Sequence, residues 1–178
     1  MGKLQPGITP SLAAFIAQQH VWFVAIAPLS AEGRVNVSPR AGVGAIAVLD
    51  AHTVAWADLS GSGSETIGHA LENGRVTLLF VNLLEGAPMI ARLHGKARVV
   101  VPSMAPTALL TAFPSALTSS PGFRAIVWVD VTRVTTSCGY SMPVFGPPQR
   151  IRSTLDEYAA AKGPTGMTEY RRLKNSLR

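Results

Sequence analysis

The chain has 178 residues, of which 47% are hydrophobic and only 15% are charged, and its formal net charge is +6. An average soluble domain has about 25% charged residues, so this chain is apolar for its size. That composition excludes a disordered chain, which combines low hydrophobicity with high charge. We expect a single domain at this length, and the excess of apolar surface points to an oligomer interface.

Short apolar runs and a lone cysteine exclude further classes. The best candidate for a membrane span, residues 43–49, is far shorter than the roughly 20 apolar residues that a span needs. The N-terminal segment contains Lys3, Pro6 and Pro10 where a secretory signal has an unbroken apolar stretch. Cys138 is the only cysteine, which excludes an internal disulfide and a cysteine-rich zinc site. We therefore expect a cytoplasmic protein without a membrane partner.

Most of the positive charge lies at the C-terminal end. Residues 150–178 carry seven Lys or Arg against three Asp or Glu, a net +4, whereas residues 1–149 carry only +2. This distribution differs from the broad basic face of nucleic-acid binders. We interpret the tail as a solvated basic helix and expect no nucleic-acid partner.

The first part of the chain predicts a helix, four strands and a second helix. Thr9 and Pro10 predict the start of a helix over 10–17, because threonine caps helices and proline fits the first turn. Strand-forming residues and tight turns predict strands over 20–27, 34–38, 45–49 and 53–57, and a helix follows over 65–72. Pro39 ends the second strand or places it at the edge of a sheet.

The second part predicts three longer strands and two helices. The strands cover 75–83, 89–101 and 123–135; the helices cover 107–112 and 153–162, and a helical basic tail follows Gly163-Pro164. Regular alternation of strand and helix is absent. The pattern therefore predicts an antiparallel barrel of six or seven strands with appended helices, not a parallel sheet. We expect one domain over 1–178, with a core at about 10–145 and a helical extension at about 150–178.

The first candidate site is the polar turn DLSGSGSET at residues 58–66, between a predicted strand and a predicted helix. Glycines let a ligand approach the backbone, and a helix N-terminus offers free N–H groups and partial positive charge to an anion. With its hydroxyls, the turn is a plausible phosphate cradle. It matches neither the P-loop nor the dinucleotide fingerprint. The alternative is an ordinary capped turn in which Ser62 and Glu65 form a capping box.

The second candidate site is the strand segment RVNVSPR at residues 34–40. Alternation places the polar side chains on one face and the valines on the other: Asn36, Ser38 and Arg40 against Val35 and Val37. An arginine on such a face can bind a phosphate through two hydrogen bonds. Pro39 donates no backbone hydrogen bond, which suits an edge along which a flat ligand lies. The alternative is a solvated hairpin face.

The third candidate is the loop around Cys138 and Tyr140. A nucleophilic cysteine needs a histidine partner, and none of the four histidines carries a recognisable signature. We therefore interpret Cys138 as a buried or idle thiol and Tyr140 as a residue that stacks on a ring or closes a pocket. No metal site is predicted, because no ligand spacing such as His-Glu-x-x-His occurs. No side chain is assigned a catalytic acid or base role.

Three blocks together resemble the pyridoxamine 5′-phosphate oxidase-like, FMN-binding split-barrel family. They are RVNVSPR at 34–40, VAWADLSGSGSET at 54–66 and ENGRVTLLF at 72–80. The loop that begins at Cys138 is similar to one in an uncharacterised branch of that family. The resemblance covers about residues 10–145 and implies a six-stranded antiparallel split barrel. It also implies a homodimer with two FMN sites at the interface.

The resemblance implies that the strand 36–39 runs beside the flavin ring and that the turn and helix start hold the phosphate. The implied cofactor-binding residues are Asn36, Val37, Ser38, Pro39, Arg40, Asp58, Ser60, Gly61, Ser62, Gly63, Ser64 and Thr66. Tyr140 is the expected contact on the substrate side. The chain departs from many relatives in the phosphate turn, where Ser64 and Thr66 stand in place of Arg or Lys.

The activity implied by the resemblance is that of an FMN-dependent oxidoreductase, in which the flavin exchanges a hydride with a small, unidentified substrate. The motif with which the true oxidase recognises pyridoxal phosphate is not recognisable, so oxidation of pyridoxamine phosphate itself is not expected. One alternative is the same fold with a deazaflavin or haem. Another is a non-catalytic flavin-binding or sensor protein.

Overall fold

The computed structural model describes residues 3–61, 64–84, 86–140, 142, 144–145 and 154–174. Its strands are β1 (Lys3–Gln5), β2 (Val21–Ile26), β3 (Asn36–Ala41), β4 (Ile46–Asp50), β5 (Thr53–Leu59), β6 (Arg75–Val81), β7 (Met89–Val100) and β8 (Phe123–Cys138). Its helices are α1 (Pro10–Ala17), α2 (Glu65–Glu72), the 3₁₀ turn η1 (Pro102–Met104), α3 (Thr107–Leu110), α4 (Ser115–Thr118) and α5 (Thr154–Lys174).

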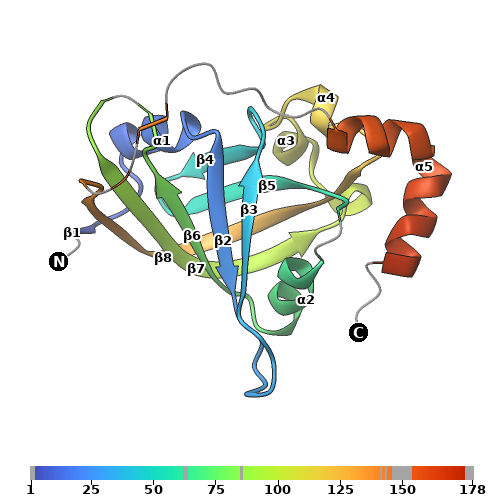
Figure 1. The fold of residues 1–178 in the computed structure, drawn as a ribbon, viewed down its shortest axis with the longest axis horizontal. Helices are drawn as coiled ribbons and strands as arrows, with labels where there is room; N and C mark the ends of the chain where they lie inside the picture. Colours follow the sequence, from blue (N-terminus) through green and yellow to red (C-terminus); the bar gives the residue numbers. More distant parts are fainter. Residues whose placement is uncertain are drawn as a thin grey trace.

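The strands form one curled antiparallel sheet with helices at its ends and side (Figure 1). The strand order is β3-β2-β6-β7-β8-β5-β4, and β1 pairs with β8. All described strand pairs are antiparallel. The path begins at β3 and ends at β4, so the sheet curls into a half-barrel that is split between these strands. This confirms the split-barrel class that the sequence predicts.

All seven strands that the residue pattern predicts are present, and β1 is the eighth. The resemblance implies six strands, so this chain has two more in its sheet. The three-residue β1 is too short to show an alternation of apolar and polar residues, which is why the pattern missed it. The helix predicted over 107–112 ends earlier, at Leu110, and the additional short helix α4 follows.

The core fills the concave side of the sheet. Alternate residues of β2 and β6 point inward and are almost completely buried, among them Trp22, Val24, Leu78 and Phe80. Helix α1 begins as predicted, with the Thr9 hydroxyl accepting a hydrogen bond from the Leu12 backbone N–H at 3.3 Å. Its apolar face packs into the same cluster and closes one end of the half-barrel.

Strand β3 lies at the split edge, and its polar side chains face the inner side. Arg40 pairs with Trp22 and Ser38 with Val24, both of which belong to the core face of β2. The outward Val37 is 60% exposed. Pro39 lies within β3, where the missing N–H is tolerated because β3 is an edge strand. The inner face of this strand therefore lines an opening in the barrel.

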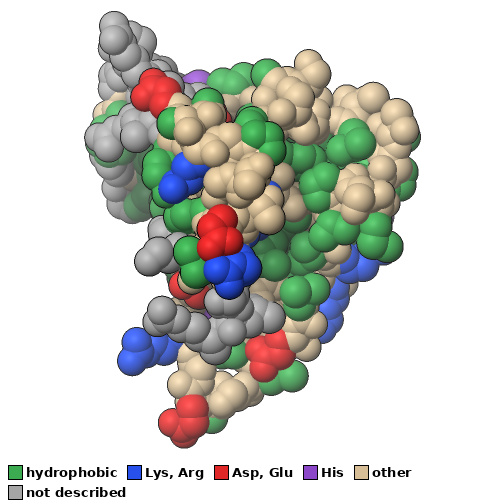
Figure 2. All heavy atoms as spheres, turned by 90° about the vertical axis from the view of Figure 1, so that its right-hand side faces the viewer, with side chains coloured by type: hydrophobic (Ala, Val, Ile, Leu, Met, Phe, Trp, Pro, Cys, Tyr) green, Lys and Arg blue, Asp and Glu red, His purple; other side chains and the backbone are tan. Residues whose placement is uncertain are grey.

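Helix α5 packs against the barrel on the side of α4 and the start of β8. It consists of two helical segments separated at Gly163, whose φ of 63° is left-handed, so the predicted break at Gly163-Pro164 is confirmed. Ala159 and Met167 are almost completely buried, one on each segment. On the face that carries α5, basic and acidic side chains are interspersed among apolar and neutral ones (Figure 2).

Candidate functional site

The two polar segments singled out in the sequence meet where β3 faces the start of α2. The Asn36 amide donates to Thr66 Oγ1 at 3.3 Å, and Arg40 Nη2 donates to the same oxygen at 3.0 Å. Ser38 Oγ donates to Asn36 Oδ1 at 3.2 Å, which fixes the amide orientation. Thr66 is almost fully buried, and both of its lone pairs are engaged. Two donors from β3 therefore converge on one buried hydroxyl oxygen of α2.

A buried carboxylate balances part of the arginine charge. Asp58 accepts from Arg124 Nε at 2.8 Å and forms an ion pair with Arg124 Nη2 at 2.6 Å, whereas Arg40 Nη2 lies 3.6 Å from it. The side chain of Asp58 is fully buried, and those of Arg124 and Arg40 are 10% and 19% exposed. The short two-point contact neutralises Arg124 more than Arg40. Arg40 therefore keeps positive charge toward the opening.

Ser60 connects the end of β5 with α5. Its backbone N–H donates to the Gly122 carbonyl at 2.7 Å, and its hydroxyl accepts from Arg171 Nη1 at 2.9 Å. Sequence reasoning missed Arg124 and Arg171. One feature of the sequence could have indicated Arg124, because it is a charged residue in an otherwise apolar stretch of β8. Arg171 had no such feature, because it lies in a generally basic tail.

A cavity of about 240 Å³ opens beside this network. Its lining residues are Trp22, Pro39, Arg40, Ala41, Gly42, Ala45, Trp56, Ala57, Asp58, Leu59, Leu117 and Asp156. Four buried polar atoms of these residues have no hydrogen-bond partner among the described residues: Trp22 Nε1, Trp56 Nε1, Arg40 Nε and Asp58 Oδ1. A buried polar group without a partner costs about 1–3 kcal/mol. The cavity is therefore suited to a polar ligand or to water.

The turn itself leaves room at Gly61. A Cβ built there meets no atom within 4 Å, and its φ is outside the left-handed region, so neither packing nor backbone geometry requires a glycine. Ser64 is the N-cap of α2, yet its side chain makes no capping hydrogen bond. Ser62, which the sequence pairs with Glu65 in a capping box, and Gly63 lie outside the described residues.

Tyr140 is not brought to this network within one chain. Asp58 pairs with Ala125 near the start of β8, whereas Cys138 ends that strand opposite Met89. The two positions are thirteen residue steps apart on β8, which corresponds to roughly 40 Å along the strand. Tyr140 follows the far end of the strand and is 83% exposed. Cys138 is exposed too, so of the expected buried or idle thiol the buried reading is wrong.

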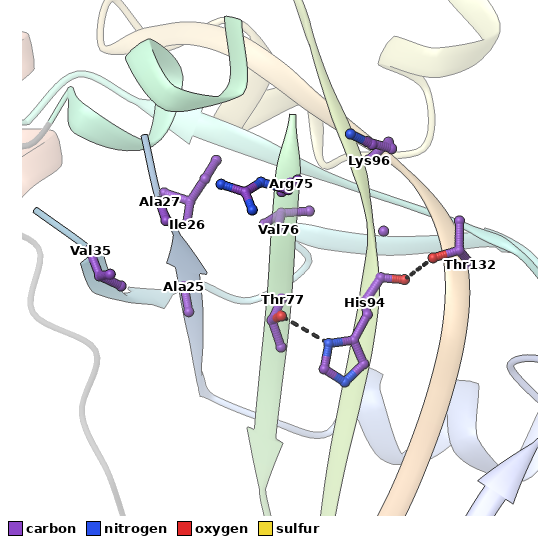
Figure 3. A pocket seen from close by; sticks show the side chains of 11 residues that line it. Ala25, Ile26, Ala27, Val35, Arg75, Val76, Thr77, His94, Lys96 and Thr132 are labelled. Carbon is purple, nitrogen blue, oxygen red and sulfur yellow. Dashed lines mark hydrogen bonds between the residues drawn. The ribbon is translucent and has the colours of Figure 1, made fainter. Parts of the chain in front are cut away.

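A second cleft, of about 470 Å³, lies on the outer face of the sheet over β2, β6 and β7 (Figure 3). Its cations are already bound to the chain: Arg75 Nη2 donates to the Pro28 carbonyl at 3.3 Å and Lys96 Nζ to the Asn73 carbonyl at 3.1 Å. His94 is hydrogen-bonded through Nδ1 to the Thr77 hydroxyl at 3.0 Å. The cleft is larger than the inner cavity but contains none of the residues predicted for the site.

The surroundings of His94 disfavour its protonation. Burial lowers the pKa of His94, and the charges of Arg133 and Arg92 lower it further. His94 and Arg92 are half-buried on this strand, whereas Lys96 is exposed.

The charged groups of the inner site suit an anion. No group of three His, Cys, Asp or Glu within the described ranges lies close enough to hold a metal ion. In the same part of the chain, every helix is too short or too polar to cross a bilayer. The site instead combines arginines from three elements with buried hydroxyls and one carboxylate.

Comparison with protein families gives one extensive match. A family model described as pyridoxamine 5′-phosphate oxidase matches residues 8–138. A curated relative from Aspergillus flavus, the pyridoxamine 5′-phosphate oxidase family protein ustO, is 34% identical over 143 residues. The alignment covers 77% of this chain and 54% of the relative, so the chain spans about half the length of that protein.

Solved structures share the fold at low identity. HupZ of Group A Streptococcus has a TM-score of 0.56 and 20% identity, over 78% of this chain and 99% of HupZ. A FAD-binding protein of Mesorhizobium loti has a TM-score of 0.51 and 13% identity, over 76% and 96% of the two chains. A conserved protein of unknown function from Corynebacterium diphtheriae has a TM-score of 0.51 and 14% identity, over 78% and 98%.

Proposed function

The chain belongs to the pyridoxamine 5′-phosphate oxidase family, and on that premise we propose that it binds FMN and acts as a flavin-dependent oxidoreductase on a small substrate. The observation that carries the proposal is the junction of β3 and α2. There Asn36 and Arg40 converge on the buried Thr66 hydroxyl beside a cavity with unsatisfied polar atoms.

The phosphate end of a flavin fits the residues present. Arg40 keeps charge because Asp58 is engaged chiefly by Arg124, and its buried Nε has no partner among the described residues. The space at Gly61 and the hydroxyl of Ser64, which makes no capping hydrogen bond to α2, belong to the same turn. A charged donor and hydroxyls around one opening are the groups that bind a phosphate monoester.

The ring end fits the edge strand. The cavity is lined by Pro39 and Ala41 of β3 and by the indoles of Trp22 and Trp56, which offer flat apolar walls and two N–H donors. A bound flavin would supply the hydride chemistry, and the protein would bind it, orient it and exclude water. A relative in fold, from Mesorhizobium loti, is named as a FAD-binding protein, which agrees with a flavin in this fold.

Among the alternative cofactors, a deazaflavin shares the phosphate chemistry and competes directly with FMN. Haem is disfavoured at this place, because none of the residues that line the inner cavity is a His, Cys, Met or Tyr able to ligate iron. A flavin-binding protein without turnover is separated from an enzyme only by assay.

We further propose that the protein forms a homodimer with the flavin sites at the interface. Exposed apolar side chains follow the outer face of β3 and the segment after β8: Val35, Val37, Tyr140, Val144 and Phe145. Large exposed apolar residues in such groups mark interaction surfaces. A second copy would also bring Tyr140 of the partner toward this chain's ring site, where the sequence predicts a substrate-side contact.

The test is an absorbance spectrum of the purified protein, followed by titration of FMN with detection by fluorescence quenching. A flavin spectrum, or saturable quenching at one FMN per chain, is the expected result. Turnover with NADH or NADPH and an electron acceptor distinguishes the oxidoreductase from a passive binder. Mass identification of a chromophore released by heating distinguishes FMN from a deazaflavin. Protein that is colourless and quenches no added FMN rules the proposal out.

A further inference from the structure

On the basis of the flavin site proposed above, we propose that helix α5 completes that site and that Arg171 supplies a cation for the cofactor's phosphate. This assigns a binding role to a part of the chain that lies outside the region matched by the family model, which ends at residue 138.

Helix α5 is anchored beside the site along one of its faces. Asp156 lines the same cavity as Arg40. Ala159 packs against the turn at Gly122, where an added Cβ would lie 3.1 Å from the alanine Cβ. Met167 is fully buried. Asp156 and Ala159 are three residues apart on the first segment of α5, and Met167 and Arg171 are four apart on the second, so one side of each segment faces the barrel.

Arg171 points into this interface and contacts the turn. Its Nη1 donates at 2.9 Å to the hydroxyl of Ser60, which is fully buried. No carboxylate of the described residues lies within ion-pair distance of its guanidinium. A guanidinium is always protonated, and no carboxylate of the described residues offsets its charge here. Burial and the nearby Arg124 lower the pKa of Arg171, which agrees with positive potential at this place.

The turn has no cation of its own. Residues 59–66, LSGSGSET, contain no Lys or Arg. Ser60 lies near the start of this segment and binds Arg171, and Thr66 lies at its end and binds Arg40. The two guanidiniums thus arrive from β3 and α5 at opposite ends of one hydroxyl-rich segment. A phosphate bound between Ser60 and Thr66 would have a cation on either side.

The next residue provides a matched control. Arg172 is exposed and forms a two-point ion pair with Glu169 on the solvent side of α5. Substitution of Arg171 or of Arg172 by Gln changes the net charge equally. Only the substitution of Arg171 removes a guanidinium that contacts the turn.

The experiment compares wild type, Arg171→Gln, Arg171→Lys and Arg172→Gln in titrations with FMN and with riboflavin, which lacks the phosphate. Arg171→Gln should weaken FMN binding about tenfold or more and change riboflavin binding by less than about twofold, because a charge-assisted hydrogen bond to the phosphate is lost. Arg171→Lys should fall between, and Arg172→Gln should match wild type. The shift of the thermal midpoint with inorganic phosphate is measured on the same proteins.

Equal FMN affinity in Arg171→Gln and Arg172→Gln overturns the inference while leaving the proposed function intact, and so does a parallel loss of FMN and riboflavin. If wild type binds neither flavin, the proposed function fails. The shift of the thermal midpoint with inorganic phosphate then tests the anion site separately. Stabilisation by phosphate that Arg171→Gln loses and Arg172→Gln retains supports a cationic site completed by α5. The same phosphate shift, or none, in all the proteins overturns it.

Discussion

Gly61 offers a direct test of the proposed phosphate site. Apart from its chain neighbours, no atom of the described residues would contact a Cβ there. We expect Gly61→Val to leave the thermal midpoint within about 2 °C of wild type, since the side chain enters open space. The same side chain would occupy the approach to the phosphate and should weaken FMN binding at least about tenfold. Unchanged FMN affinity in a folded Gly61→Val protein would show that no ligand uses this space.

Asp58 organises the arginines of the site. Asp58→Asn leaves the guanidiniums of Arg124 and Arg40 buried with less compensation, and we expect it to lower the free energy of unfolding by about 3–5 kcal/mol in urea titrations. The control is Asp130→Asn, which affects an exposed pair with Arg98 and should change stability by less than about 1 kcal/mol. Similar effects of the two substitutions would contradict the assigned role.

His94 gives the fold a predictable response to acid. Its pKa is below the ordinary 6.5 in the folded protein, because burial, Arg133 and Arg92 oppose its protonation. The unfolded chain therefore binds a proton first as the pH falls. We expect stability to be highest above pH 6.5 and to decline as the pH drops from there through the folded pKa. His94→Gln should show a smaller decline between pH 7 and 5 in urea titrations at a series of pH values, and an identical pH profile would refute this.

At the same scale, the sequence predicts one half of the candidate site. Asn36, Ser38, Arg40 and Thr66 are placed together as expected, because strand alternation and a helix start are local patterns. Arg124 comes from a strand more than 60 positions away from Asp58. No local pattern specifies such a pairing, which depends on how the sheet curls.

Among the elements, β7 and β8 pack tightly at an irregularity of their pairing. The register shifts between His94 and Gly95, and a Cβ on Gly95 would clash with the Asp130 carbonyl oxygen. We expect Gly95→Ala to lower the free energy of unfolding by about 3 kcal/mol, at the upper end of the usual overpacking range, because the obstacle is backbone. Gly61→Ala is the control with open space. Equal urea midpoints for the two variants would mean that β7 and β8 can move apart at Gly95 without a loss of stability.

Element prediction succeeded where a pattern repeats and failed where it is short. The turn-bounded strands and α1 were predicted within a few residues, since periodicity and caps are written in neighbouring residues. The docking of α5 was not predicted. Its contacts with Gly122 and Ser60 depend on a bend at Gly163 and on the distant start of β8.

For the whole molecule, the proposed dimer accounts for the apolar composition. Val37 lies on the outer face of the edge strand and is 60% exposed in the single chain. Val37→Asp should shift the protein from dimer to monomer in sedimentation velocity, because a charge would be buried at the interface. Met104→Asp, at an exposed site on η1, serves as the control and should remain dimeric. Sedimentation of the wild-type protein as a monomer would contradict the proposed dimer.

The fold class follows from the sequence because many short strands, tight turns and absent strand–helix alternation leave few other architectures. The sequence does not show where the charges that make up the net +6 lie in the folded protein. Two of the positive charges lie at the candidate site, because Arg40 and Arg171 from distant segments contact opposite ends of one hydroxyl-rich turn.

A crystal structure of the protein grown with FMN tests the central claim most directly, through the position of the phosphorus atom. We predict that the phosphate lies against the turn at 60–66, with its oxygens within hydrogen-bond distance of the Arg40 guanidinium. A phosphate found in the outer cleft at Arg75, His94 and Lys96, or FMN bound with no contact to Arg40, would contradict the account.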